Sequence, residues 1–131
     1  MEEEMEVTEP RPSGSDPETA SVGELQRKFA GMVGTLLTRI YRNGYECSFG
    51  EAFRTPEQAH LNALAGEGIS NSLHCIRLAI DLNLFKDGVF LTSVDDYRGV
   101  GEYWESIGGS WGGRFEPPDA DHFSLAYGGR K

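Results

Sequence analysis

The chain has 131 residues, of which 38% are hydrophobic and 25% charged, and these values are typical of one soluble globular domain. No apolar stretch is long enough to cross a membrane. The formal net charge is −9, but residues 1–20 hold seven of the 21 acidic residues and one of the 12 basic residues. The rest of the chain carries only −3, so its charge does not indicate nucleic-acid binding.

The acidic stretch at residues 1–20 contains Pro and Ser and few apolar residues, a composition that predicts a disordered tail. Residues 21–131 are then the single folded domain. The tail also lacks the apolar segment of a signal peptide, so we expect synthesis in a cytoplasm. Cys47 and Cys75 form no CxxC pair, and in that compartment we expect free thiols.

The first half of the domain predicts two helices and a strand. Residues 24–41 place apolar side chains at helical spacing, and Ser21 with Glu24 forms a capping box before them. Residues 45–49 alternate as a short strand does. Residues 54–66 predict a helix, because Thr55 can cap it and a proline follows at the first helical position.

The second half predicts strands around one helix. Residues 76–85 alternate strictly between apolar and other residues, and "KDG" after them is typical of a hairpin turn. Residues 93–109 predict a capped helix, residues 110–121 a Gly- and Pro-rich loop, and residues 122–127 a last strand. Hairpins in place of crossovers predict an α+β fold, a small and mostly antiparallel sheet with helices packed on one side.

Polar residues lie on the faces opposite the apolar faces of two predicted strands. Asp81 lies on the face opposite Ile80 and Leu82, and His122 lies opposite Phe123. With His74 they could supply the three N or O ligands that catalytic zinc uses, while Asp119, three residues before His122, could act as a general base. Each of these residues taken singly is more often an ordinary hydrogen-bonded side chain, and spacing alone leaves both interpretations open.

The spacing of His74 and Asp81 raises a geometric conflict. Strand faces repeat every two residues, so positions seven apart point in opposite directions. The two side chains can share a metal only if His74 lies in a turn before the strand, or if a bulge near residues 75–77 resets the face. We therefore predict that the alternation breaks between Ser72 and Leu78.

Two short motifs resemble a known family. "SLHCIRLAIDL" resembles the S-x-H-x₆-D signature of zinc peptidases that cleave peptidoglycan peptides, and "DADHF" resembles their second signature. The family includes D-Ala-D-Ala carboxypeptidases, D-Ala-D-Ala dipeptidases and phage L-alanyl-D-glutamate endopeptidases, and it shares its fold with the Hedgehog signalling domain. The similarity spans about residues 25–128, and "EAFRTPEQ", "LAIDLNLF" and "GGSWGGRF" look most like the compact phage members.

The resemblance implies roles for six residues, listed here: His74, Asp81 and His122 as Zn²⁺ ligands, Asp119 as catalytic acid/base, Arg54 as a cation that steadies the oxyanion or a substrate carboxylate, and Ser72 near the substrate. The first signature often has Gly where this chain has Arg77. Asp121 and Glu116 lie in the same loop as Asp119, and either could assist it.

The expected function is zinc-dependent hydrolysis of a peptide bond in the peptidoglycan stem peptide, as in a phage endolysin of the L-alanyl-D-glutamate endopeptidase type. A D-Ala-D-Ala carboxypeptidase or dipeptidase is the first alternative, and a non-catalytic, zinc-stabilised wall-binding domain is the second. We expect a monomer that is made in the host cytoplasm, reaches the cell wall after release, and binds peptidoglycan and neither nucleic acid nor a membrane.

Overall fold

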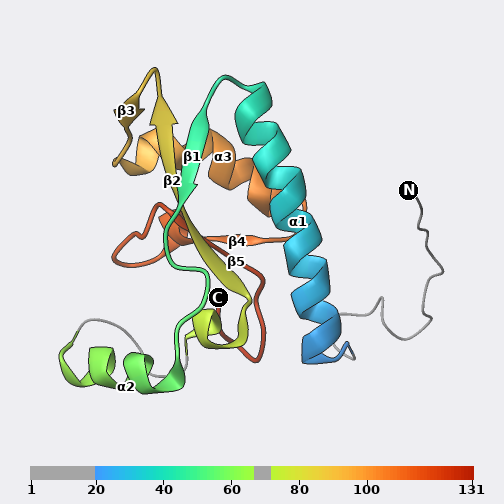
Figure 1. The fold of residues 1–131 in the computed structure, drawn as a ribbon, viewed down its shortest axis with the longest axis vertical. Coiled ribbons are helices and arrows are strands. Elements are labelled where there is room, and N and C mark those ends of the chain that lie inside the picture. Colours follow the sequence, from blue (N-terminus) through green and yellow to red (C-terminus); the bar gives the residue numbers. More distant parts are fainter. Residues whose placement is uncertain (1–19, 67–71) are drawn as a thin grey trace.

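The computed structural model describes residues 20–66 and 72–131, so the tail predicted at residues 1–20 lies outside the described residues except for Ala20. The described part is an α+β fold with a small antiparallel sheet, as the sequence predicts (Figure 1). Its elements in chain order are α1 (Val22–Arg42), β1 (Glu46–Phe49), α2 (Pro56–Leu64), the 3₁₀ helix η2 (Leu73–Ile76), β2 (Ala79–Lys86), β3 (Val89–Phe90), α3 (Val94–Ser106), β4 (Ser110–Trp111), the 3₁₀ helix η3 (Gly112–Arg114) and β5 (His122–Ser124).

Local signals set the ends of the two long helices. The Ser21 hydroxyl accepts a hydrogen bond from the backbone N–H of Glu24, and the Glu24 carboxylate accepts one from the N–H of Ser21. Ser93 and Asp96 form the same reciprocal pair at the start of α3. Each box satisfies two backbone donors that have no partner within the helix, which is why both helices begin where the sequence predicts.

Strand β2 is the centre of the sheet. Along one edge it pairs with β1, and along the other its first residues pair with β5 and its last residues with β3. The chain order across the main sheet is β1-β2-β5-β4, and the described pairings are all antiparallel. The β2–β3 hairpin turns at Asp87 and Gly88, both with positive φ, as its "KDG" motif predicts.

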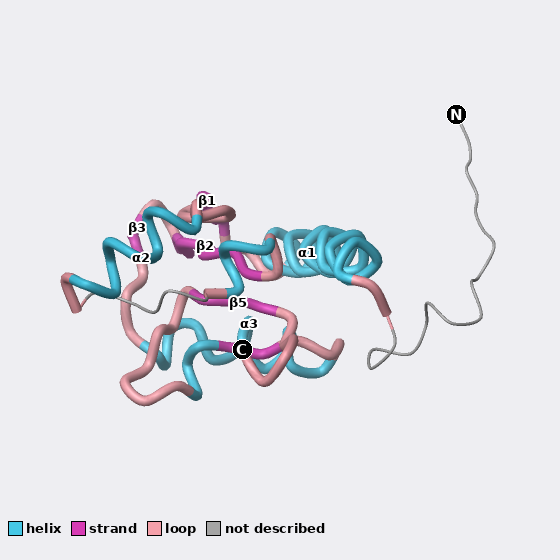
Figure 2. Tube along the Cα trace, turned by 90° about the horizontal axis from the view of Figure 1, so that it is seen from below, coloured by secondary structure: helices cyan, strands magenta, loops and turns pink. Residues whose placement is uncertain are grey.

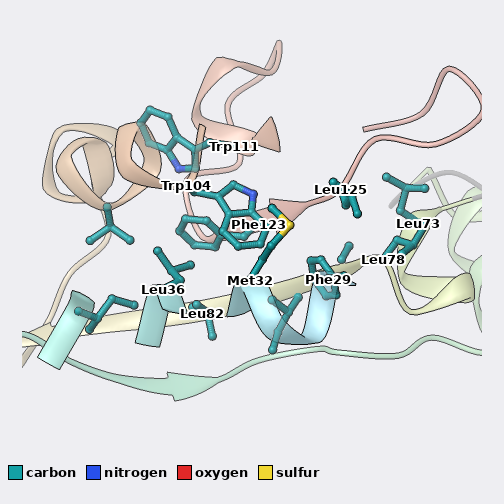
Figure 3. Close-up of a cluster of buried hydrophobic side chains, with 14 of the residues drawn as sticks. Phe29, Met32, Leu36, Leu73, Leu78, Leu82, Trp104, Trp111, Phe123 and Leu125 are labelled. Carbon is teal, nitrogen blue, oxygen red and sulfur yellow. The ribbon is translucent and has the colours of Figure 1, made fainter. Parts of the chain in front are cut away.

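The core lies between the sheet and the helices α1 and α3. Phe29 of α1 meets Trp104 of α3 edge-on, with ring centroids 5.8 Å apart, and Trp104 meets Phe123 of β5 at 6.1 Å. Figure 3 shows this aromatic group facing Met32 of α1, with Leu82 of β2 nearby. Burying such large side chains is the main source of stability in a domain of this size.

Helix α2 stands apart from this core. Figures 1 and 2 show it on the opposite side of the molecule from α1, and none of its described residues belongs to the central apolar cluster. The predicted packing of helices on one side therefore holds for α1 and α3 but does not extend to α2. No helix in the described ranges is both long enough and apolar enough to cross a bilayer.

Several element boundaries differ from those predicted, and the differences in the sheet bear most on the site. Strand β2 begins at Ala79 and not at residue 76, and β5 ends at Ser124 and not at residue 127. The stretch predicted as a loop at residues 110–121 contains β4 and η3. The sequence pattern did not predict β4, because two residues are too few to show alternation. Only its pairing with β5 defines this strand.

Candidate metal centre

A tight turn sets the position of His74. Ser72 caps η2, and its hydroxyl accepts a hydrogen bond from the backbone N–H of His74 at 3.1 Å. Arg77 then takes the left-handed conformation, with φ of 58° and ψ of 38°, and β2 begins two residues later. The alternation therefore breaks between Ser72 and Leu78, as predicted, and it breaks by a turn before the strand.

Pairing between strands places Asp81 beside His122. The two residues are direct partners across β2 and β5, and their neighbours Ile80 and Phe123 are partners on the opposite face. Side chains of directly opposed residues in an antiparallel pair lie on the same side of the sheet. Ile80 and Phe123 thus enter the core, while Asp81 and His122 share the other face.

Three side-chain atoms converge on one point. Asp81 Oδ1 lies 3.4 Å from His74 Nε2 and 3.8 Å from His122 Nδ1, and one ligand atom from each residue lies within 4.8 Å of the others. These separations exceed the 2.7–3.2 Å of an ordinary N–H···O hydrogen bond. They are close to the roughly 3.3–3.6 Å between ligand atoms in a tetrahedral zinc site with bonds of about 2.0–2.2 Å.

The burial of these three side chains also indicates a metal site. His74 and His122 are 3% and 6% exposed, and Asp81 Oδ1 is buried without a hydrogen-bond partner in the described part of the chain. A buried carboxylate oxygen without a partner is costly unless a cation or a donor satisfies it. The donor set of two imidazoles and one carboxylate therefore fits Zn²⁺ both in chemistry and in spacing.

Asp119 lies at the open side of this group. Its Oδ2 is 4.0 Å from His122 Nδ1, and its side chain is 55% exposed. The loop is held by the N–H of Asp119, which donates to the Gly112 carbonyl at 2.7 Å, and by the N–H of His122, which donates to the Asp119 carbonyl at 3.1 Å. The sequence-predicted general base thus lies next to the three predicted ligands and in contact with solvent.

Asp121 joins Asp119 and Asp81 in a second group of carboxylates, whose ligand atoms also lie within 4.8 Å of one another. Burial, together with the neighbouring Asp119, raises the pKa of Asp121 to about 7. Burial, and next the nearby His74, lowers the pKa of His122, which favours the neutral imidazole that a metal needs. Glu116 is exposed and belongs to neither group.

Arg54 and Ser72 lie close to the metal centre, and each has a protein partner. The Arg54 Nε–H donates to the Glu51 carboxylate at 2.9 Å, and the Arg54 backbone N–H donates to the His74 carbonyl at 3.2 Å. Ser72 is 6% exposed, and its hydroxyl holds the backbone of His74. Contact of either residue with substrate remains a prediction.

Glu51 is a residue that the sequence analysis missed. Its Oε1 lies 3.7 Å from His74 Nδ1, on the side of the imidazole away from Asp81. The acid three residues before Arg54 in "GEAFR" was the available signal, but no periodicity connects it to His74, which is distant in the chain.

The chain is similar to known proteins in part of its sequence and in its fold. Residues 65–125 match the model of a family described as D-alanyl-D-alanine carboxypeptidase. The fold is similar to that of the L-Ala D-Glu endopeptidase ChiX of Serratia marcescens, with a TM-score of 0.65, 21% identity, and coverage of 82% of this chain and 88% of that one. It is also similar to the zinc-bound vancomycin resistance D,D-pentapeptidase VanY (E175A mutant) of a VanB-type cassette, with a TM-score of 0.50, 17% identity, and coverage of 75% and 70%. A comparison with curated proteins found no match.

Proposed function

We propose that the chain is a zinc peptidase of the D-alanyl-D-alanine carboxypeptidase family that acts on peptidoglycan, and that it is an endolysin-type L-alanyl-D-glutamate endopeptidase. The observation that carries the catalytic part of the proposal is the position of Asp119. It stands exposed beside three convergent donor atoms, whereas a structural zinc site is usually closed by four protein ligands.

His74, Asp81 and His122 would hold Zn²⁺, which when bound lowers the pKa of a water molecule and polarises the scissile carbonyl. Asp119 takes a proton from the attacking water and gives it to the leaving amine. The Arg54 guanidinium, which is held by Glu51, stabilises the negative charge of the tetrahedral intermediate. Ser72 lies at the start of η2 next to these groups, and we propose that it lines the substrate site.

We propose that the cleaved bond is the one between L-alanine and D-glutamate. The motifs "EAFRTPEQ" and "GGSWGGRF" resemble compact phage members that cut between L-alanine and D-glutamate. The fold similarity to an L-Ala D-Glu endopeptidase, which covers most of both chains, agrees with that choice. We further propose that the enzyme is a monomer made in the cytoplasm of a phage-infected host and that it reaches the wall after release.

Two alternatives remain distinct in their products. A D-Ala-D-Ala carboxypeptidase or dipeptidase agrees with the description of the matching family, and either would release free D-alanine. A non-catalytic, zinc-stabilised domain would release nothing from peptidoglycan. The presence of Asp119 disfavours this last reading, because a purely structural site needs no general base.

The test is mass spectrometry of purified peptidoglycan after digestion with and without a chelator. The proposal expects fragments with new L-alanine carboxyl termini and D-glutamate amino termini, which are lost with chelator and restored by added zinc. Free D-alanine in their place would select the carboxypeptidase. If no chelator-sensitive product forms, the enzymatic proposal fails.

Asp119→Ala is the matched variant for the same digest. We expect it to bind zinc and to release at least about a hundredfold less product, since general acid–base catalysis contributes 10²–10⁴-fold. Glu46→Ala, an exposed acid on β1, is the control and should digest normally. Full digestion by Asp119→Ala would show that Asp119 is not the catalytic acid/base. No digestion by the unchanged protein, together with loss of folding in His74→Ala, would favour the non-catalytic domain.

A further inference from the structure

The backbone of β2 fixes the position of Glu51. The ladder between β1 and β2 continues one step past Phe49, because the N–H of Gly50 donates to the Asp81 carbonyl at 2.8 Å and the N–H of Asp81 donates to the Glu51 carbonyl at 2.9 Å. An added Cβ at Gly50 would lie 3.0 Å from the Cβ of Asp81, so the two segments are in close contact. Glu51 is therefore tied to one proposed zinc ligand through its main chain.

The side chain of Glu51 faces another proposed ligand. Its Oε1 lies 3.7 Å from His74 Nδ1, a nitrogen that is buried and has no hydrogen-bond partner among the described residues. The other nitrogen of the same ring, Nε2, points to Asp81. The first distance is longer than the about 2.7–3.2 Å of a hydrogen bond, so the two atoms face each other in close approach.

The chemistry of imidazole explains what the contact between Glu51 and His74 can do. A neutral histidine carries its proton on one ring nitrogen and a lone pair on the other. A proton on Nδ1, held by a carboxylate, leaves the lone pair of Nε2 free for a metal and makes it more basic. The Arg54 guanidinium, which donates to the same carboxylate at 2.9 Å, keeps Glu51 in place.

We propose that Glu51 is a positioning residue that holds His74 with its proton on Nδ1 and so presents Nε2 to zinc. This inference rests on the proposed zinc site but not on the choice of substrate. A surface ion pair between Glu51 and Arg54 would be the ordinary alternative. It does not account for the direction of Glu51, whose carboxylate reaches toward a buried nitrogen of His74 from a side chain that is 34% exposed.

The first experiment measures zinc affinity without substrate, by competition with a chromophoric chelator. Glu51→Ala should weaken zinc binding by about 10- to 100-fold, the usual effect of removing the partner of a ligand histidine. Glu51→Gln keeps an oxygen acceptor and loses the charge, so it should recover part of the affinity. Glu46→Ala removes an exposed acid from the neighbouring strand and should bind zinc as the unchanged protein does.

The second experiment observes the imidazole directly. In zinc-free protein labelled with ¹⁵N, the ring nitrogens of His74 should report a proton on Nδ1, and Glu51→Ala should shift that population toward a mixture of tautomers. A role in folding alone would lower thermal stability without moving either readout.

Three results would overturn the proposal: unchanged zinc affinity in Glu51→Ala, a proton on Nε2 of His74 in the unchanged protein, or failure of the unchanged protein to bind zinc. Since both measurements use zinc or no ligand, they are independent of peptidoglycan digestion. A protein that binds zinc through a Glu51-dependent site and cuts no wall peptide would refute only the proposed substrate.

Discussion

At Arg77 the chain turns through a backbone conformation that L-residues seldom adopt. Its φ of 58° costs a non-glycine residue about 1–2 kcal/mol, and the turn is what carries the chain from His74 into β2. The Arg77 guanidinium lies 4.0 Å from the centroid of the Phe53 ring, a cation–π contact worth about 0.5–1 kcal/mol at an exposed site. This stacking offsets part of the backbone cost.

Replacement of Arg77 by Gly and by Ala separates the two effects. Both variants lose the contact with Phe53, but only alanine keeps the strained backbone. We expect Arg77→Gly to be about 1 kcal/mol more stable than Arg77→Ala, the reverse of their order in a regular strand or helix. Urea denaturation of both variants measures the difference, and an alanine variant at least as stable as the glycine variant would contradict it.

Sequence reasoning was successful for single residues where a conflict in the pattern pointed to them. His74 and Asp81 could not share a strand face, so a turn before β2 was required, and the structure has one. It failed for Glu51, because the relation of that residue to His74 exists only after β1 and β2 pair. The roles of the proposed ligands in binding zinc remain predictions.

Among the elements, the segment from β4 to β5 is tightly constrained by a glycine. A Cβ on Gly112 would lie 2.2 Å from the Asp119 carbonyl oxygen and 2.7 Å from the Cβ of His122. The same glycine carbonyl accepts the hydrogen bond from the Asp119 N–H. Close approach of η3 to the loop thus sets the positions of both the proposed base and one proposed ligand.

Gly112→Ala adds only one methyl group, but we expect it to disturb the metal centre. We expect a loss of about 1–3 kcal/mol in unfolding free energy from overpacking, together with weaker zinc binding, since the backbone of Asp119 must move. Gly99→Ala is the control, because its Cβ would have no neighbour within 4 Å and alanine favours the helix α3. Equal stability and zinc affinity in the two variants would rule out this tight packing.

Elements with local signals were predicted well. The capping boxes of α1 and α3 and the Asp87–Gly88 turn are each encoded within four residues, so no tertiary information is needed. Strand β4 and the early end of β5 depend on partners far along the chain, and the pattern of residues 110–127 did not reveal them.

For the molecule as a whole, the group of acids at the metal centre links stability to pH. Asp121 has a pKa raised to about 7 in the folded chain, above the ordinary value of 3.8 that applies when it unfolds. Between these values the folded state retains a proton that the unfolded state has lost. Asp121 should therefore make the zinc-free protein lose stability as the pH rises from about 4 to about 7, while His122, whose pKa is lowered, contributes in the opposite direction.

Thermal melts of zinc-free and zinc-saturated protein across this range test the effect. The rise in melting temperature on adding zinc should be larger at pH 8 than at pH 5.5, because the cation offsets carboxylate repulsion and protons compete for histidine at low pH. Asp121→Asn should flatten the pH dependence of the zinc-free protein. An Asp121→Asn variant with the same pH dependence as the unchanged protein would contradict the direction assigned to the pKa of Asp121.

Strand β2 carries the core on one face and the proposed ligand Asp81 on the other, through consecutive residues. A slip of one residue in its pairing would turn Asp81 into the apolar interior and Ile80 out to the metal centre. Misregistered molecules would then neither pack nor retain zinc, whereas correctly paired ones gain stability from each bound ion. Zinc binding would in this way select for the correct strand register. The zinc-bound protein would be enriched in molecules whose central strand is correctly paired.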